Sequence, residues 1–232
     1  MDDLWGGLAE AGRLLARGDR EVWGVILLSL RVSLTATAVS LLLGVPAGAA
    51  LALSRFPGRA LLVGLVHTGM GLPPVSVGLI VSLLLWRSGP LGELRLLYTP
   101  TAMVIAQAVI ATPIVIGLTL AAVQGLDPRL RLQLLALGAS RRQAAWWLLR
   151  EARLPLIAAL IAGFGAIISE VGAAMMVGGN IKGETRVLTT ATVLEVGRGN
   201  FEVAVALTIV LLVLTYSVNL TLTAIQQHGR RW

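Results

Sequence analysis

The sequence holds few side chains that could act as a nucleophile, a metal ligand or an acid–base catalyst. Cysteine is absent, so disulfides, thiolate metal sites and cysteine nucleophiles are excluded. His67 and His228 are the two histidines, and no HExxH pattern or His/Asp/Glu cluster with metal-ligand spacing accompanies them. No GxxxxGK[ST] loop is present to hold the phosphates of a nucleotide. We therefore predict a chain that is not an enzyme and has no catalytic residue, no metal site and no cofactor of its own.

Two polar side chains, Ser169 and Glu170, stand past the middle of the apolar run 156–177. An ionisable residue in such a run is a functional candidate, because its burial away from water is costly. We assign Glu170 to a gate or to hydrogen bonding between helices, with Arg31 as its candidate partner.

Charge gathers in one internal segment, "LQLLALGASRRQAAWWLLREARLPLI", residues 132–157. Asp127 is a good N-cap before Pro128, and Gly138 is a good helix stop. Ser140 and Gln143 form a capping-box pattern that starts a second helix, which we expect to run to about Arg153. The segment is either a plain loop whose arginines fix the topology or a helix–turn–helix built to dock into a partner.

The composition is that of an integral membrane protein. Hydrophobic residues make up 56% of the 232 residues and charged residues only 13%, whereas a soluble domain carries about 25%. The net charge of +7 comes from arginines that lie in short blocks between apolar runs. This distribution favours a membrane explanation over binding of nucleic acid, so we predict the lipid bilayer as a partner and no nucleic acid.

Apolar runs long enough to cross a bilayer core of roughly 30 Å occur five times. They cover residues 22–53, 60–86, 101–123, 156–177 and 203–223. We predict an all-α membrane protein with about five transmembrane helices, the first of them long and bent near Gly44 and Pro46. Small and polar residues form a stripe at helical spacing along this first helix, which indicates helix packing or, alternatively, a pathway lining. The stripe consists of Ser29, Ser33, Thr37, Ser40, Gly44 and Gly48.

The distribution of arginine predicts the orientation. The loop at 54–59, the segment 124–155 with a net charge of +4, and the C-terminus fall on one side when five spans are threaded. The positive-inside rule places that side in the cytoplasm and the N-terminus outside. We predict an N-terminal segment at 1–21, either an interfacial helix or a loosely ordered tail. It is followed by a membrane domain at 22–225, which contains the basic loop at about 127–155, and by a cytoplasmic tail at 226–232.

Two further segments depart from plain spans. "HTGMGLPPVSVG", residues 67–78, interrupts the second run with Pro73 and Pro74, next to Ser76. It is either a kink or a break that lines a pathway. After the fourth run, glycines around Asn180 lead to a short apolar stretch at 187–196. We expect this stretch to be an outer re-entrant or gating helix, with a surface loop as the alternative.

The "ALGAS" sequence followed by a basic helix resembles the cytoplasmic loop of ATP-binding-cassette importer permeases. In that family a short coupling helix enters a groove of the ATPase subunit, and its signature is EAA, three residues, Gly, nine residues and I-x-LP. Gly138 is kept here, whereas the EAA positions read Leu132, Gln133 and Leu134. The Leu154–Pro155 pair comes four residues late.

Two longer blocks resemble the tungstate-type permeases, relatives of the molybdate and sulfate permeases. They are "LPPVSVGLIVSLLLWRSGPLGELRLLYTPTAMVIAQ" and "EVGAAMMVGGNIKGETRVLTTATVLEVGRGNFEVAVAL", and the similarity runs from about Ser33 to Gln227. The resemblance implies the permease subunit of an ATP-driven importer of a tetrahedral oxyanion, tungstate first and molybdate or sulfate as the alternative. A stand-alone secondary transporter and a non-transporting membrane scaffold are further alternatives.

The resemblance also implies partners and sites. The expected complex holds two copies of this chain in the inner cell membrane, two ATPase subunits carrying ATP and Mg, and an extracytoplasmic oxyanion-binding protein. The residues expected to couple to the ATPase are Arg131, Gln133, Leu134, Leu137, Gly138, Ala139, Ser140, Arg141 and Arg142. The residues expected in the pathway or gate are Pro73, Pro74, Ser76, Ser169, Glu170 and Asn180. A carboxylate repels a divalent oxyanion, so Glu170 is assigned to the gate rather than to the ligand.

Overall fold

The structure, a computed structural model, describes residues 6–7, 10–13 and 20–228. Within these residues the regular elements are all helices, so the predicted all-α membrane class is confirmed. Three continuous helices are long and apolar enough to cross a membrane: α2 (Arg20–Leu53), α5 (Pro100–Gln124) and α11 (Phe201–His228). Up to five spans result if each of two bent helix pairs counts as one span.

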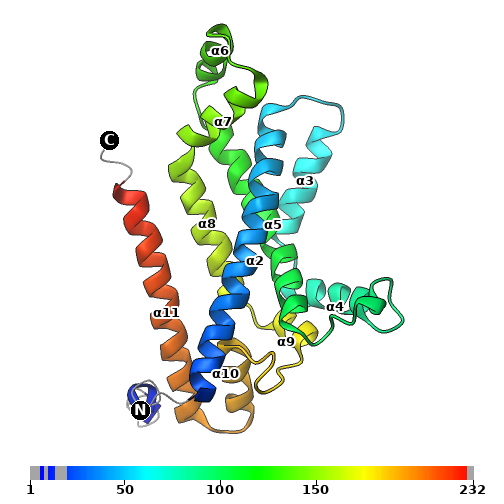
Figure 1. The fold of residues 1–232 in the computed structure, drawn as a ribbon, viewed down its shortest axis with the longest axis vertical. Coiled ribbons are helices and arrows are strands. Elements are labelled where there is room, and N and C mark those ends of the chain that lie inside the picture. The colour runs from blue at the N-terminus through cyan, green and yellow to red at the C-terminus, as the bar shows by residue number, and fades with distance from the viewer. Residues whose placement is uncertain (1–5, 8–9, 14–19, 229–232) are drawn as a thin grey trace.

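The pair α2 and α5 forms the centre of the bundle because small residues let the two backbones approach closely (Figure 1). A Cβ atom at Gly44 would lie 2.7 Å from Cγ1 of Val115, and one at Gly48 would lie 2.6 Å from the carbonyl oxygen of Ile116. The six stripe residues of α2 are all buried. The packing interpretation of the stripe is therefore confirmed.

The second apolar run is not one straight span. It divides into α3 (Arg59–Met70) and α4 (Pro74–Leu85), whose axes differ by 102°. Pro74 occupies the first turn of α4, where its missing N–H costs nothing, and Pro73 is the N-cap in an extended conformation. The interruption predicted at 67–78 is thus a sharp change of direction. The short 3-10 helix η1 (Gly92–Leu94) follows α4 and leads toward α5.

The predicted fourth span is also divided. Helix α8 (Arg153–Ile168) ends before Ser169. Three residues, 169–171, separate it from the short α9 (Gly172–Gly178). Helix α9 packs tightly on α4, since a Cβ at Gly78 would lie 2.7 Å from Cα of Ala173. The stretch predicted as a short helix at 187–196 is α10 (Leu188–Gly197), which packs on α11.

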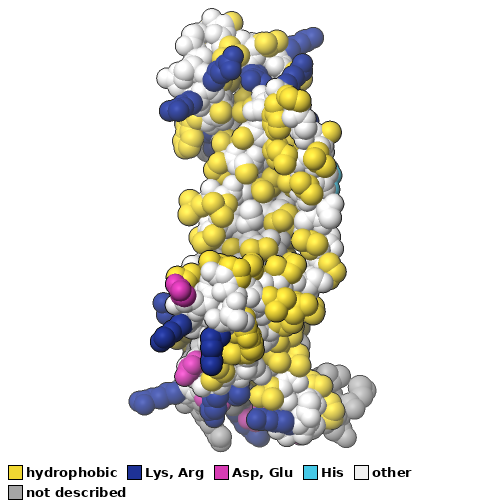
Figure 2. Space-filling view, turned by 90° about the vertical axis from the view of Figure 1, so that its right-hand side faces the viewer, with side chains coloured by type: hydrophobic (Ala, Val, Ile, Leu, Met, Phe, Trp, Pro, Cys, Tyr) yellow, Lys and Arg dark blue, Asp and Glu magenta, His cyan; other side chains and the backbone are white. Residues whose placement is uncertain are grey.

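The two ends of the molecule differ in their elements and charges. Helices α6 (Pro128–Ala136) and α7 (Arg141–Glu151) lie at one end, together with the α2–α3 connection and the last turns of α11 (Figure 1). The start of α2 and α10 lie at the other end. On the face shown in Figure 2, Lys and Arg stand without acidic neighbours at the α6 end. Both signs of charge appear at the opposite end, with a hydrophobic band between. The loop at 54–59 and the segment 124–155 therefore share one end, as the threading predicts, while Arg230 and Arg231 lie outside the described residues.

The chain termini are only partly described. Residues 6–7 and 10–13 are helical, and Ala11 is buried beside α10 and α11. Leu4, Leu8 and Leu15, which suggested an interfacial helix, lie outside the described residues. Helix α11 continues to His228, so it includes the first three residues of the predicted tail at 226–232.

Candidate functional site

The α6–α7 hairpin, residues 127–151, is built by local capping. The Asp127 Oδ1 atom accepts a hydrogen bond from the Arg129 N–H at 2.8 Å. Ser140 Oγ accepts from the Gln143 N–H at 3.3 Å, and Gln143 Oε1 accepts from the Ser140 N–H at 2.8 Å. Both predicted helices and both caps are confirmed, and α7 ends at Glu151, two residues before the predicted boundary.

The turn between the two helices depends on Gly138. Its φ of +87° lies in the left-handed region, which a Cβ atom disfavours. No other atom stands within 4 Å of where a Cβ would be, so backbone conformation, not crowding, requires glycine here. The turn reverses the chain and leaves Leu137 at the tip of the hairpin.

Helix α6 buries none of its residues, although it carries several leucines. Leu132 is 67% exposed and Leu137 is 86% exposed. The helix projects beyond the bundle at its basic end (Figure 1), away from the hydrophobic band of Figure 2. Large apolar side chains presented outside the membrane level indicate a surface for a protein partner.

The hairpin is joined to α2 at its base. The Arg131 guanidinium donates from Nη1 to the Leu53 carbonyl oxygen at 2.9 Å. Arg59, at the start of α3, likewise donates from Nε to the Leu51 carbonyl oxygen of α2 at 2.8 Å. These bonds satisfy carbonyl groups that the end of a helix leaves unpaired. Ala144 and Leu148 of α7 are buried. The Arg131 bond therefore links the hairpin to α2, the longest helix of the bundle.

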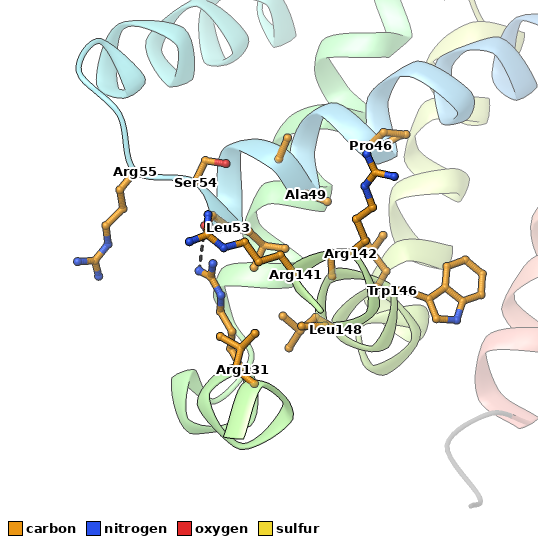
Figure 3. A pocket seen from close by; sticks show the side chains of 15 residues that line it. Pro46, Ala49, Leu53, Ser54, Arg55, Arg131, Arg141, Arg142, Trp146 and Leu148 are labelled. Atoms are coloured by element: carbon orange, nitrogen blue, oxygen red, sulfur yellow. Dashed lines mark hydrogen bonds between the residues drawn. The ribbon is translucent and has the colours of Figure 1, made fainter. Parts of the chain in front are cut away.

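The structure divides the nine predicted coupling residues into three groups. Gln133, Leu137 and Gly138 lie on the exposed helix and tip. Arg131, Arg141 and Arg142 instead line a cavity between the hairpin and α2 (Figure 3). The remaining three, Leu134, Ala139 and Ser140, are held by local hydrogen bonds. The Ala139 N–H donates to the Leu134 carbonyl, and the Ser140 hydroxyl caps α7.

Glu170 lies at the break between α8 and α9 and is 8% exposed. Its Oε1 atom accepts from the Ala173 N–H at 2.8 Å, which caps α9, and its carbonyl oxygen accepts from Thr189 Oγ1 at 2.9 Å. The predicted pairing with Arg31 is wrong, since none of the ion pairs among the described residues involves Glu170. Arg31 lines a different cavity, near Lys182.

The predicted pathway residues come from the start of α4, the α8–α9 break and the loop after α9. The first two meet, since a Cβ atom at Gly172 would lie 2.6 Å from Val75 Cγ2 and 3.5 Å from Glu170 Oε1. Pro73 and Ser76 stand at the exposed start of α4, and the Ser76 N–H donates to the Pro73 carbonyl at 2.9 Å. The hydroxyl of Ser169, just past the end of α8, donates to the Gly165 carbonyl of that helix at 2.8 Å. The Asn180 side chain donates to the Thr190 carbonyl at 3.2 Å and accepts from Arg186 Nε at 3.3 Å.

Several structurally important polar residues escaped sequence reasoning. Thr185, fully buried, donates to the Gly178 carbonyl at 2.6 Å and accepts from the Ile181 N–H at 2.9 Å. Ser29 accepts from the Leu188 N–H at 2.8 Å, a bond that links α2 to α10. Gln107 is a buried amide in α5 whose Oε1 atom has no partner among the described residues. Gln107 could have been singled out from the sequence, because it is a lone side-chain amide in the apolar run 101–123.

The fold and the exposed helix at the basic end define a class of membrane transport subunit, the permease of an ATP-binding-cassette importer. A solved structure of the MetNI methionine ABC transporter in inward-facing conformations has the same fold, with a TM-score of 0.72 at 18% identity over 90% of this chain and 94% of that chain. The family model of the binding-protein-dependent transport system inner membrane component matches residues 41–231. The chain belongs to this family.

Several proteins similar to this chain are named as permeases for tungstate, for an anion or for molybdenum. A tungstate uptake system permease protein of Peptoclostridium acidaminophilum is 38% identical over 98% of this chain and all of its own length. A probable anion ABC transporter permease protein of Haloferax volcanii is 43% identical, over 82% of this chain and 84% of its own. A molybdenum transport system permease protein of Escherichia coli is 32% identical, over 73% of this chain and 77% of its own. The predicted family of oxyanion permeases is confirmed.

Proposed function

We propose that this chain is the membrane-spanning, non-catalytic subunit of an ATP-driven importer of a tetrahedral oxyanion, with tungstate as its substrate. The observation that carries the proposal is α6, which presents Leu132 and Leu137 outside the hydrophobic band with no partner in the bundle. The tungstate relative, similar over its whole length, supports the choice of substrate class.

The proposed complex has two copies of this chain, two ATPase subunits and an extracytoplasmic oxyanion-binding protein. ATP and Mg belong to the ATPase partners. The α6 end faces the cytoplasm, as does the C-terminus, while the N-terminus lies outside, because the arginine segments share the α6 end. The inner cell membrane is the proposed location.

The chain's own residues supply the mechanical part of the transport cycle. ATPase movement displaces α6, and the Arg131–Leu53 bond passes that displacement to α2. Helix α7 leads through α8 to the break before α9, where the Glu170 carbonyl holds α10 through Thr189. ATP binding and hydrolysis on the partner thereby favour one of two conformations, outward-open or inward-open.

The first test is a pull-down of tagged chain from native membranes, with mass spectrometry of its partners, beside a Gly138→Trp variant. We expect an ATPase subunit at a ratio of about one to one with the chain, and its loss in the variant, because a side chain at φ +87° distorts the turn. Gly183→Trp is the matched control: its φ is +79°, its surroundings are equally open, and it lies at the other end. If the unaltered chain brings down no ATPase under mild detergent, the stand-alone transporter becomes the better hypothesis.

Substrate choice needs a separate measurement. Tungstate and molybdate are nearly alike in size, shape and charge, and the molybdenum permease of E. coli is also similar to this chain. We propose that discrimination rests with the binding protein. Uptake competition among tungstate, molybdate and sulfate in intact cells tests the tungstate assignment, and preferential inhibition by molybdate or sulfate would transfer it to that anion.

A further inference from the structure

A cavity of about 840 Å³ separates the end of α2 from the α6–α7 hairpin (Figure 3). Its lining includes four arginines and no acidic residue. The arginines are Arg55, Arg131, Arg141 and Arg142. The remaining lining is largely apolar. Arg131 is half-buried and the other three arginines are exposed, so the positive charge gathers at the open side of an apolar cavity.

Only one of the four guanidinium groups has an acceptor within the described residues. Arg131 donates to the Leu53 carbonyl. Figure 3 shows Arg141 pointing toward the end of α2 and Arg142 reaching toward Pro46, whereas Arg55 points away from both. Arg141 and Arg142 make no ion pair in the described structure. The positive charge inside the cavity is therefore uncompensated.

The position of this charge in α7 is unfavourable by itself. Arg141 and Arg142 are the first two residues of an 11-residue helix, and the first turn holds no acidic residue. The N-terminal end of a helix carries partial positive charge, which repels cations and attracts anions. An anion bound in the cavity would relieve both the helix end and the two guanidinium groups.

The cavity lies at the end of a spanning helix, where lipid headgroups are expected. Pro46, Ala49 and Leu53 come from the last two turns of the spanning helix α2, and Leu148 comes from the buried face of α7. A basic pocket between helices at this level suits an acidic lipid headgroup. The planar fork of arginine matches two phosphate oxygens at once.

We propose that this cavity binds the phosphate group of an anionic phospholipid, held by Arg141 and Arg142 beside Arg131. A free tetrahedral oxyanion has the same chemistry, and the experiment distinguishes the two sources. Bound phosphate would join the start of α7 to the end of α2 and so stiffen the base of the hairpin. This inference goes beyond the proposed transport function and does not depend on an ATPase partner.

The test uses the purified full chain, without ATPase, in phosphatidylcholine nanodiscs with and without phosphatidylglycerol. Native mass spectrometry counts retained phosphatidylglycerol, and a fluorescent phosphatidylglycerol gives the affinity. We expect Arg141→Gln/Arg142→Gln to weaken binding by roughly fivefold for each arginine removed. Arg129→Gln/Arg153→Gln is the matched control, since it removes two exposed arginines of the same segment that do not line the cavity.

A titration with inorganic phosphate and with molybdate identifies the source of the anion. Selective retention of phosphatidylglycerol that millimolar phosphate does not displace supports the lipid headgroup. Saturable binding of free phosphate without lipid preference retains the site and assigns it to a soluble oxyanion. Equal weakening of binding in the cavity variant and its control overturns the proposal. So does the failure of the unaltered, folded chain, as judged by helical circular dichroism, to bind either phosphatidylglycerol or free phosphate.

Discussion

The α6–α7 hairpin and the segment 172–197, which holds α9 and α10, stand at different levels of the same bundle and are stabilised differently. In the hairpin, the side-chain bonds that define the fold join residues two or three positions apart, and Arg131 provides a tie to α2. In the segment 172–197, buried hydroxyl and amide groups tie loops and helices together. The hairpin leaves apolar surface exposed, whereas the other segment buries Leu188 and Thr190 completely. The hairpin thus offers an apolar surface for a partner, whereas the segment 172–197 is stabilised by its own buried hydrogen bonds.

The largest effect should come from Thr185→Val. The substitution keeps the shape but leaves the Ile181 N–H and the Gly178 carbonyl without their side-chain partner, at a cost of about 3 kcal/mol. Intrinsic tryptophan fluorescence during heating in detergent should show a clearly lower melting temperature. Thr208→Val is the control, because Thr208 bonds only to the Ala204 carbonyl in its own helix. Equal melting of the two variants would contradict the picture of a self-tied segment.

The next effect concerns binding rather than stability. Leu137→Glu should leave the melting temperature unchanged, because Leu137 is 86% exposed. It should weaken the affinity for the ATPase subunit by roughly thirtyfold, the equivalent of about 2 kcal/mol for a buried leucine. Biolayer interferometry with purified ATPase measures this. Val193→Glu, also at an exposed apolar position but on α10, should bind the ATPase normally; weak binding by both variants would speak against a specific hairpin surface.

A smaller effect is expected from Ser140→Ala. Loss of the hydroxyl that accepts from Gln143 N–H removes one half of the capping box and costs about 1 kcal/mol of local helix stability. Hydrogen exchange should speed up in the first turn of α7 and leave α10 unaffected. Ser140→Asp restores an acceptor and should return exchange to its original rate; faster exchange in Ser140→Asp as well would refute the capping argument.

The smallest effect should follow Glu21→Gln, which removes ion pairs with the exposed Lys182 at 2.7 Å and with Arg186, whose side chain is 14% exposed, at 3.8 Å. Such pairs contribute about 0.5 kcal/mol and are screened by salt. The melting temperature should fall slightly at low ionic strength and match the unaltered chain at high ionic strength. A drop that persists in high salt would mean that Glu21 stabilises the segment by something other than charge.

Particular elements show where sequence reasoning succeeded. The caps at Asp127 and Ser140 and the turn at Gly138 were predictable because each depends on residues within four positions of it. The burial of the small-residue stripe in α2 followed from its helical spacing. Membrane class and the shared end of the arginine segments followed from hydropathy and charge alone.

Other predictions from the sequence were wrong or incomplete for a common reason. Glu170 was given Arg31 as a partner because both are charged residues in apolar runs, but the break after Ile168 turns the carboxylate back onto α9. The break of the second run at 67–78 was predicted, but its 102° change of direction was not. The fourth run was read as a single span, whereas α8 ends at Ile168 and α9 begins at Gly172. Hydropathy measures length and apolarity, and it contains no information on direction.

By itself the sequence determined that the chain enters a membrane and that its basic end carries a capped helical hairpin. These properties are sums over composition or contacts between near neighbours in the chain. Only the tertiary structure decided that Ser29 bonds Leu188, that α3 and α4 differ in direction by 102°, and that Arg141 and Arg142 face a cavity behind the hairpin rather than its tip. The Ser29–Leu188 bond and the cavity join residues far apart in sequence, so they exist only once the helices have packed. The direction of α4 relative to α3 is set at a short break, and hydropathy does not contain it.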